Sequence, residues 1–337
     1  AQLVLNGLKA NMVEFTGDVG TQLTLPDGTT YTSGYKAEYT ARTSAAQKYN
    51  KIDVGTTNIA QNDQYYIQLG EELYDGDLEL DNSAIDDFGR PSRLWSFEGE
   101  DIGTYAKEEL IRATYTVEVE GGTIYGDIGS TACDYTLDYW VDGVRYSNAD
   151  IDNEADKLAR RNSDVVGTTG NGVLTEVYVD TQAEETTIVE IHTYLAEVTA
   201  DYNERTEQLN LNVYDDVRVS GGEYTAVSSG ARAHLDDVAN LADFADGDMV
   251  LVTRAGEDEV IMSVEPVEVI SGVTASAYTS NNDDKMTSLT ADGTKYDAAR
   301  EAYYEAEWLY DYQQEQLYDY TYDLYLDNYG YIIGIED

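Results

Sequence analysis

The stretch Gln22-Leu23-Thr24-Leu25-Pro26-Asp27-Gly28-Thr29-Thr30-Tyr31 shows the pattern that decides the fold. Apolar and polar residues alternate on both sides of a Pro-Asp-Gly turn, which predicts two β-strands joined by that turn. Similar runs, separated by Gly and Asp turns, are Tyr65 to Leu69, Ala113 to Val119, Tyr135 to Val144, Val173 to Val179 and Ile188 to Leu195. The sequence therefore predicts a mainly β protein, built as two or three β-sandwich or small-barrel domains with a few short helices.

Four segments lack this alternation and predict helices. Ala1 to Phe15 has apolar residues close to helical spacing without an N-cap, which indicates the end of a helix that begins upstream. Asn153 to Asn162 follows an Asn cap, and Leu235 to Phe244 precedes an Asp-Gly-Asp turn. The segment 296–320 fits a helix or two irregular strands, and we favour a helix from Ala298 to Gln316.

Glycine-rich or irregular segments near 167–172 and 269–272 suggest domain boundaries. We expect residues 1–15 to end an upstream helix, 16–170 to form a first β-rich domain and 171–270 a second. Residues 271–337 would then be a C-terminal β/α segment packing on the second domain. The run from Gly167 to Gly172 lacks the Lys-Ser/Thr of a phosphate-binding loop, so we interpret it as a flexible linker.

Charge excludes several classes of partner. The chain has 66 Asp and Glu against 20 Lys and Arg, a net charge of −46 over 337 residues. Such a surface repels nucleic acid and anionic lipid and attracts cations. No run approaches the roughly 20 apolar residues of a membrane helix, so we expect no membrane span. The 30 Tyr among the aromatic residues suit half-buried strands and subunit interfaces.

Residue types that perform chemistry are scarce. Two isolated histidines, His192 and His234, give no zinc spacing, and the lone Cys133 excludes an intrachain disulfide. No Gly-x-Ser-x-Gly nucleophile elbow occurs. Acidic pairs are too frequent to indicate a hydrolase, which would need a pocket holding two carboxylates with different pKa values. We therefore expect no enzyme and no catalytic residues.

Calcium is the one cofactor that the sequence suggests, because hard cations bind clustered oxygen ligands. Two clusters alternate along the chain, which on a strand places the carboxylates on one face, and a third fills a predicted loop beside Asn281 and Asn282. None matches an EF-hand loop. The candidate ligands are Asp75, Asp77, Glu79, Asp81, Asp150, Asp152, Glu154, Asp156, Asp283 and Asp284. The alternative is a solvated acidic face without bound metal.

One region carries a family resemblance: Asp86-Asp87-Phe88-Gly89-Arg90-Pro91-Ser92-Arg93-Leu94-Trp95-Ser96-Phe97, followed by Asp101-Ile102-Gly103-Thr104-Tyr105-Ala106. It resembles the region after the anchoring domains in secreted S-layer homology (SLH) proteins of clostridia and related Firmicutes. Shorter similar pieces are Gln2 to Ala10, Ile124 to Gly129, Val141 to Val144, Phe244 to Val252 and Asp323 to Gly334. From the residues alone, Gly89-Arg90-Pro91 suits a tight turn at a structural corner.

The resemblance implies a secreted protein held on the cell wall by SLH repeats that bind pyruvylated wall polysaccharide, with the remainder forming a coat or appendage. It implies no catalytic residues. Apart from a last helix near Gln2 to Ala10, the repeats are missing here, so anchoring would need an upstream segment. Our hypothesis is an extracellular, self-assembling structural protein of the cell surface. The alternative is a monomeric adhesin or carbohydrate-binding module, in which exposed Trp95, Trp140 and Trp308 would form a sugar platform.

Overall fold

The computed structural model describes residues 78–81, 83–97, 99–146, 167–220, 223–281, 285–304 and 320–336, together with five short strands before residue 60. The chain divides into two compact units. The first comprises Ala1–Asp86 with Arg90–Leu110, and the second comprises Asp87–Gly89 with Ile111–Asp337. Each unit is described on its own below.

In the described part of the first unit, the strands form small antiparallel sheets. Strands β1 (Gln22–Thr24) and β2 (Thr30–Thr32) pair around the Pro-Asp-Gly segment, which confirms the predicted hairpin. A second sheet joins β3 (Lys36–Glu38), β4 (Lys51–Val54) and β5 (Thr57–Ile59). A third joins β6 (Leu78–Asp81), β7 (Ser92–Phe97) and β8 (Glu100–Ala106), followed by the short helix η2 (Glu108–Leu110).

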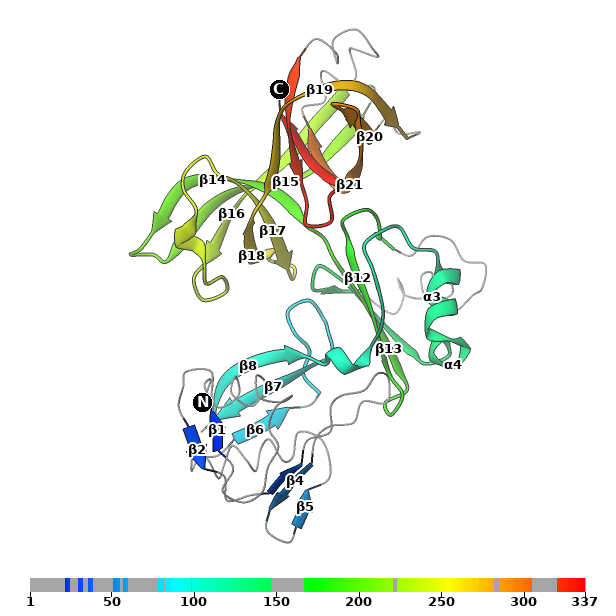
Figure 1. Ribbon diagram of the computed structural model, residues 1–337, viewed down its shortest axis with the longest axis vertical. Helices are drawn as coiled ribbons and strands as arrows, with labels where there is room; N and C mark the ends of the chain where they lie inside the picture. Colours follow the sequence, from blue (N-terminus) through cyan, green and yellow to red (C-terminus); the bar gives the residue numbers. More distant parts are fainter. Residues whose placement is uncertain are drawn as a thin grey trace. The chain divides into compact units, whose positions relative to one another are not determined.

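The second unit begins with a five-stranded sheet, here called sheet A (Figure 1). Its strands are β9 (Ile111–Tyr115), β10 (Thr136–Val141), β11 (Val144–Arg145), β12 (Leu174–Asp180) and β13 (Glu185–Ile191), in the order β11-β10-β13-β12-β9. Helices α3 (Gly121–Ile128) and α4 (Ser130–Cys133) contact β9 and β13. Ile124 of α3 is buried in one core with Val177 and Ile188 of the sheet, so the apolar residues of the helix and strands complete one another.

The next five strands form barrel B. They are β14 (Tyr194–Asn203), β15 (Gln208–Ser220), β16 (Glu223–His234), β17 (Met249–Ala255) and β18 (Val260–Pro266), with the short helix η3 (Leu241–Asp243) between β16 and β17. The hydrogen-bonded order is β16-β15-β14-β17-β18, and the outer strands β16 and β18 contact each other. The sheet therefore curls into a partly open barrel around a core that includes Val198, Leu209 and Val250.

The last five strands form barrel C, which is closed (Figure 1). They are β19 (Glu268–Ser280), β20 (Met286–Ala291), β21 (Thr294–Tyr304), β22 (Thr321–Leu326) and β23 (Ile332–Glu336), in the order β19-β20-β21-β23-β22. β21 and β23 run parallel and the other pairs antiparallel. This is the strand order of the OB type of Greek-key barrel, and barrel B has the corresponding antiparallel pairs. The second unit thus contains two consecutive barrels of one topology.

The prediction of a mainly β protein with small barrels is confirmed. The helix predicted from Ala298 to Gln316 is wrong over its first part, because residues 298–304 belong to β21. There Ala298, Ala302 and Tyr304 are buried in the core of barrel C, so tertiary packing overrides the helix propensity of Ala and Glu. Between 235 and 244 only η3 is helical. The predicted helices 1–15 and 153–162, the predicted strand 65–69 and the remainder of 298–316 lie outside the described residues.

Two observations bear on the expected boundaries. Sheet A takes β9 and β10 from before residue 170 and β12 and β13 from after it, so a boundary at 170/171 would fall within one sheet. Barrel C begins at Glu268, immediately after β18 ends at Pro266. Among the described residues, no helix is long and apolar enough to cross a membrane.

Candidate functional site: a buried polar network between sheet A and the two barrels

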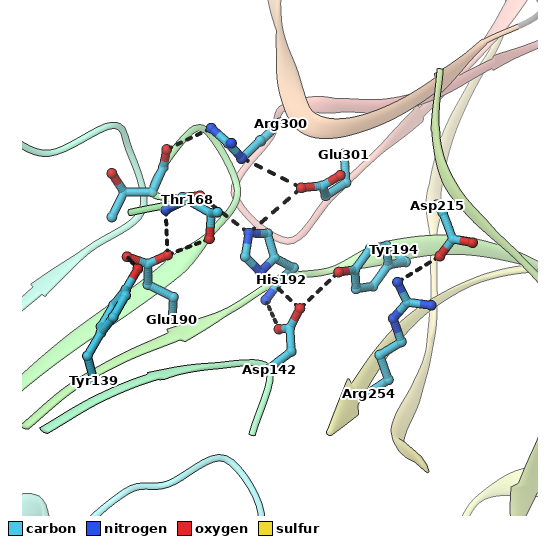
Figure 2. A network of polar contacts seen from close by, with 11 residues as sticks. Tyr139, Asp142, Thr168, Glu190, His192, Tyr194, Asp215, Arg254, Arg300 and Glu301 are labelled. Carbon is cyan, nitrogen blue, oxygen red and sulfur yellow. Dashed lines mark hydrogen bonds and ion pairs between the residues drawn. The ribbon is translucent and has the colours of Figure 1, made fainter. Parts of the chain in front are cut away.

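The chain passes from sheet A into barrel B through only two residues, His192 and Thr193, which lie between β13 and β14. His192 is only 3% exposed. Figure 2 shows its imidazole at the centre of a network of polar side chains drawn from sheet A, barrel B and barrel C. A polar group this deeply buried requires partners, which makes the network the most informative site of the second unit.

On one side of the imidazole, the carboxylate of Asp142 makes several of the contacts. It forms the β10–β11 turn with Gly143, and both have positive φ, 45° and 71°, as a tight Asp-Gly hairpin requires. Asp142 Oδ1 accepts a hydrogen bond from the His192 backbone N–H at 2.8 Å, and Oδ2 lies 3.0 Å from His192 Nδ1. Oδ2 also accepts a hydrogen bond from the Tyr194 hydroxyl at 2.9 Å. One carboxylate therefore holds the backbone and ring of His192 and the first residue of β14.

The opposite side of the imidazole faces two other oxygen atoms. His192 Nε2 lies 3.3 Å from the Thr168 carbonyl oxygen and 3.7 Å from Glu301 Oε1 of β21. Burial alone would lower the pKa of His192, but the interaction with Asp142 and the charges of Glu301 and Glu190 outweigh it and raise the pKa. The surroundings therefore favour the imidazolium form.

Glu190, on β13, is fully buried and lies in the same network. Its Oε1 accepts a hydrogen bond from the Tyr139 hydroxyl at 2.7 Å. Its Oε2 accepts from the Thr168 N–H at 2.9 Å and the Thr168 hydroxyl at 2.6 Å. Burial raises the pKa of Glu190, and these hydrogen bonds oppose the rise. Glu190 thus fixes the beginning of segment 167–172 onto sheet A.

Two arginines complete the network at its ends. The Arg254 guanidinium of β17 lies 4.1 Å from the centre of the Tyr194 ring and forms an ion pair with Asp215 at 2.7 Å. The Arg300 guanidinium of β21 donates to the Thr169 carbonyl at 3.2 Å, and its Nε lies 3.7 Å from Glu301 Oε1. Acidic and basic groups therefore alternate along the network from Asp215 to Arg300, across sheet A, barrel B and barrel C.

The segment 167–172 is not the flexible linker that its glycines suggest. Besides the bonds of Thr168 and Thr169, the Asn171 carbonyl accepts from the Arg300 N–H at 2.8 Å, and Asn171 Nδ2 donates to the Ala298 carbonyl at 3.1 Å. Gly167 has a φ of 48° and is so close to Tyr139 that a Cβ would overlap its hydroxyl. Glycine here permits close packing, and the segment joins sheet A to barrel C.

The arrangement does not provide a nucleophile. An Asp–His pair activates a hydroxyl or thiol when that group lies at Nε2, whereas the Nε2 neighbours of His192 are a carbonyl and a carboxylate oxygen. Because His192 and Glu190 are both buried, neither is placed to meet a substrate. The chemistry available to this cluster is to hold or release a proton.

The predicted metal ligands are mostly outside the described residues. Glu79 and Asp81 lie exposed on one face of β6, and Asp81 Oδ1 accepts hydrogen bonds from the Ser83 N–H and hydroxyl at 2.8 and 2.7 Å. The other eight predicted ligands lie outside the described residues: Asp75, Asp77, Asp150, Asp152, Glu154, Asp156, Asp283 and Asp284. Within the described residues, no group of three or more His, Cys, Asp or Glu side chains is placed to hold a metal ion.

The residues of the expected sugar platform are only partly described. Trp140 is half-buried, and its Nε1 donates to Asp138 Oδ2 at 2.8 Å. The side chain of Trp95 and all of Trp308 lie outside the described residues. A pocket of about 690 Å³ lies on barrel B, lined by residues of β14, β15, β16 and β18 and by Arg254 of β17 with the turn that follows it. None of the described residues that line it is Trp, Tyr or Phe, so it lacks the large ring surface expected of a sugar platform.

Sequence reasoning treated His192 as isolated, because its partners are distant in the chain. Asp142 precedes it by 50 residues, and Glu301 belongs to β21 of barrel C, more than 100 residues further along the chain. The signals that were present are the Asp142-Gly143 turn and the apolar run around His192, which together indicate a buried histidine beside a hairpin.

No protein-family model, curated protein or solved structure matches this chain.

Proposed function

We propose that this chain is a non-enzymatic structural protein of the cell surface that self-assembles into an S-layer-like coat or an extracellular filament. The observation that carries the proposal is that the buried His–carboxylate network joins three parts of the second unit and does not face a substrate. Its polar side chains connect sheet A, barrel B and barrel C, and its imidazole faces protein oxygen atoms on both sides. A protein that transmits load or keeps a repeat spacing benefits from modules joined without flexible linkers.

Charge and composition support an extracellular assembly. A net charge of −46 gives strong repulsion between copies, which divalent cations would relieve on assembly. The resemblance of residues 86–106 to secreted SLH proteins favours the cell surface, with wall polysaccharide as a partner. Calcium bound at acidic clusters such as that containing Glu79 and Asp81 is part of this proposal.

Negative-stain electron microscopy of the purified protein at neutral pH, with calcium and then with excess EDTA, tests the proposal. We expect ordered sheets or filaments that loosen in EDTA. The variant Glu79→Gln/Asp81→Asn should weaken assembly at limiting calcium. A matched control, Asp236→Asn/Asp237→Asn, removes the same charge from an exposed turn of barrel B and should assemble normally.

Dispersed particles under both conditions would overturn self-assembly and favour the adhesin or carbohydrate-binding alternative. Glycan-array binding would then be the next measurement. Assembly that is indifferent to EDTA and to both double variants would leave the coat but remove calcium from the explanation.

A further inference from the structure

We propose that His192 acts as a proton-operated lock: its imidazolium holds segment 167–172 and strand β21 of barrel C against the Asp142 turn of sheet A, and loss of the proton loosens this junction. The proposal concerns the second unit alone and does not depend on self-assembly. It rests on the placement of the two ring nitrogens of a buried imidazole.

Both ring nitrogens lie close to oxygen atoms: Nε2 is in hydrogen-bond geometry with the Thr168 carbonyl, whereas Nδ1 is close to the Asp142 carboxylate as an ion pair without a directed hydrogen bond. Nδ1 lies 3.0 Å from Asp142 Oδ2, and Nε2 lies 3.3 Å from the Thr168 carbonyl oxygen and 3.7 Å from Glu301 Oε1. An imidazolium carries two N–H donors, one for each side, whereas neutral imidazole carries one. The neutral form would lose the positive charge that pairs with the Asp142 and Glu301 carboxylates, and it would have one N–H donor for the two sides of the ring, which is unfavourable in a buried site.

The charged groups around the His192 ring come from sheet A and from barrel C. Negative charge is contributed by Asp142 in the β10–β11 turn, Glu190 on β13 and Glu301 on β21. The hydroxyl groups of Tyr139 and Tyr194 donate hydrogen bonds to Glu190 and Asp142. The nearby cations, Arg254 on β17 and Arg300 on β21, also interact with Asp215, Glu259 and Glu301. Removing the proton from His192 therefore leaves three carboxylates around an uncharged ring.

The direction of the pH effect follows from linkage. The pKa of His192 is raised in the folded protein relative to about 6.5 in an unfolded chain. Its stabilisation is thus fully present below pH 6.5 and is lost as the pH rises through the folded pKa. The pKa of Glu190 is raised as well, so its ionisation weakens the junction in the same direction. For His192 alone, the opening equilibrium should increase about tenfold for each pKa unit by which its folded value exceeds 6.5.

The chain allows a direct measurement, because it contains only two histidines. In the full chain with ¹⁵N-labelled histidine, NMR titration should give two imidazole signals, which a His234→Gln variant assigns. We expect His192 to titrate above 6.5, with both ring nitrogens protonated at pH 6. Hydrogen-exchange protection of the Thr168 and His192 amides, corrected for intrinsic exchange, should fall as that proton is lost.

Variants distinguish the effect of His192 titration from the effect of other groups that titrate in a protein with net charge −46. His192→Gln should remove the part of the pH dependence of amide protection at 167–172 that follows the His192 titration, leaving only the part due to Glu190, whereas His234→Gln, which changes an exposed histidine, should retain both parts. If His192→Gln does not fold, Glu301→Gln decides: it removes one facing charge and should lower the pKa of His192. A His192 that stays neutral at pH 6, or protection at Thr168 that does not change across the titration, would overturn the proposal.

Discussion

Barrel C contacts its neighbours in two different ways. Against barrel B it uses an apolar cluster, in which Ala299, Tyr325 and Ile333 of barrel C pack with Leu195, Tyr214 and Leu251 of barrel B. Against segment 167–172 and the Asp142 turn it uses the polar network around His192. The first contact is mainly apolar, and burial raises the pKa values of its Tyr214, Tyr325 and Tyr331 above the usual range. The second contact is almost entirely polar.

The difference suggests that one contact supplies most of the stability of the junction, whereas the other sets its geometry and its dependence on pH. Apolar burial is non-directional and insensitive to pH, so the cluster around Leu195 should provide most of the adhesion between the barrels. The polar network requires particular donors opposite particular acceptors, so it fixes the angle between modules at a desolvation cost. The first contact should therefore tolerate changes of pH that weaken the second.

Leu195→Ala should produce the largest effect. Leu195 is buried, and its Cδ2 methyl occupies the place where Gly334 of β23 lacks a side chain. We expect a loss of about 2–5 kcal/mol in the free energy of unfolding, similar at pH 6 and pH 8.5. Chemical denaturation at both pH values measures it, with the exposed Val269→Ala as control. A loss below about 0.5 kcal/mol would mean that the cluster collapses without cost.

Asp142→Asn tests the polar contact and should cost about 2–3 kcal/mol at pH 6, because it removes the charge that faces His192 Nδ1 and Tyr194. Asn accepts the positive φ of this turn, so the backbone is not strained by the change. The matched control is Asp292→Asn, which lies in the exposed Asp-Gly turn between β20 and β21 with a φ of 47°. Equal losses in the two variants, measured by urea denaturation, would argue against a special role for Asp142.

The features that the sequence predicted are local ones. Alternation with period two is set by the strand itself, so the runs at 135–144 and 173–179 correspond to β10 with the start of β11 and to β12, whereas the run at 113–119 overlaps β9 only at 113–115. The run 188–195 was also recognised, but as one strand. In the structure it divides at His192 between sheet A and barrel B.

The features that the sequence did not predict depend on distant pairing. Nothing within β21 identifies β23 as its parallel neighbour, so the shared topology of the two barrels became visible only from the ladder order. His192 has a carboxylate partner in sheet A and another in barrel C, and neither spacing forms a known motif. Conversely, the helix expected at 298–304 followed propensity, which the burial of alternate residues in a closed barrel overrides.

Tyr139→Phe should cost about 1–2 kcal/mol, because it leaves Glu190 Oε1 without its hydroxyl donor in a fully buried position. Tyrosine hydroxyls replace scarce cations as partners of carboxylates elsewhere too, as in Tyr115–Asp127 and Tyr325–Glu336. Tyr178→Phe is the comparison: its ring is equally buried, but its hydroxyl bonds to the half-exposed Glu176 at 3.0 Å. Thermal unfolding should rank Tyr139→Phe as the more destabilising change, and the reverse order would show that burial of the acceptor does not decide the cost.

Lys295→Gln should have the smallest effect, below about 0.5 kcal/mol, although Lys295 Nζ lies only 2.9 Å from Asp297 Oδ1. Both side chains are more than half exposed, at 62% and 51%, so water screens the attraction and ordering the pair costs side-chain entropy. The comparison is Arg254→Gln, whose ion pair with Asp215 is of similar length, 2.7 Å, but whose side chains are only 11% and 24% exposed. In a chain of net charge −46, removing any cation adds long-range repulsion, which 1 M salt suppresses because the screening length falls to about 3 Å. Urea denaturation in low and high salt should therefore remove the Lys295→Gln effect and leave most of the Arg254→Gln effect. If both effects disappear in salt, the buried ion pair of Arg254 contributes through overall charge alone, and burial does not distinguish it from the exposed pair of Lys295.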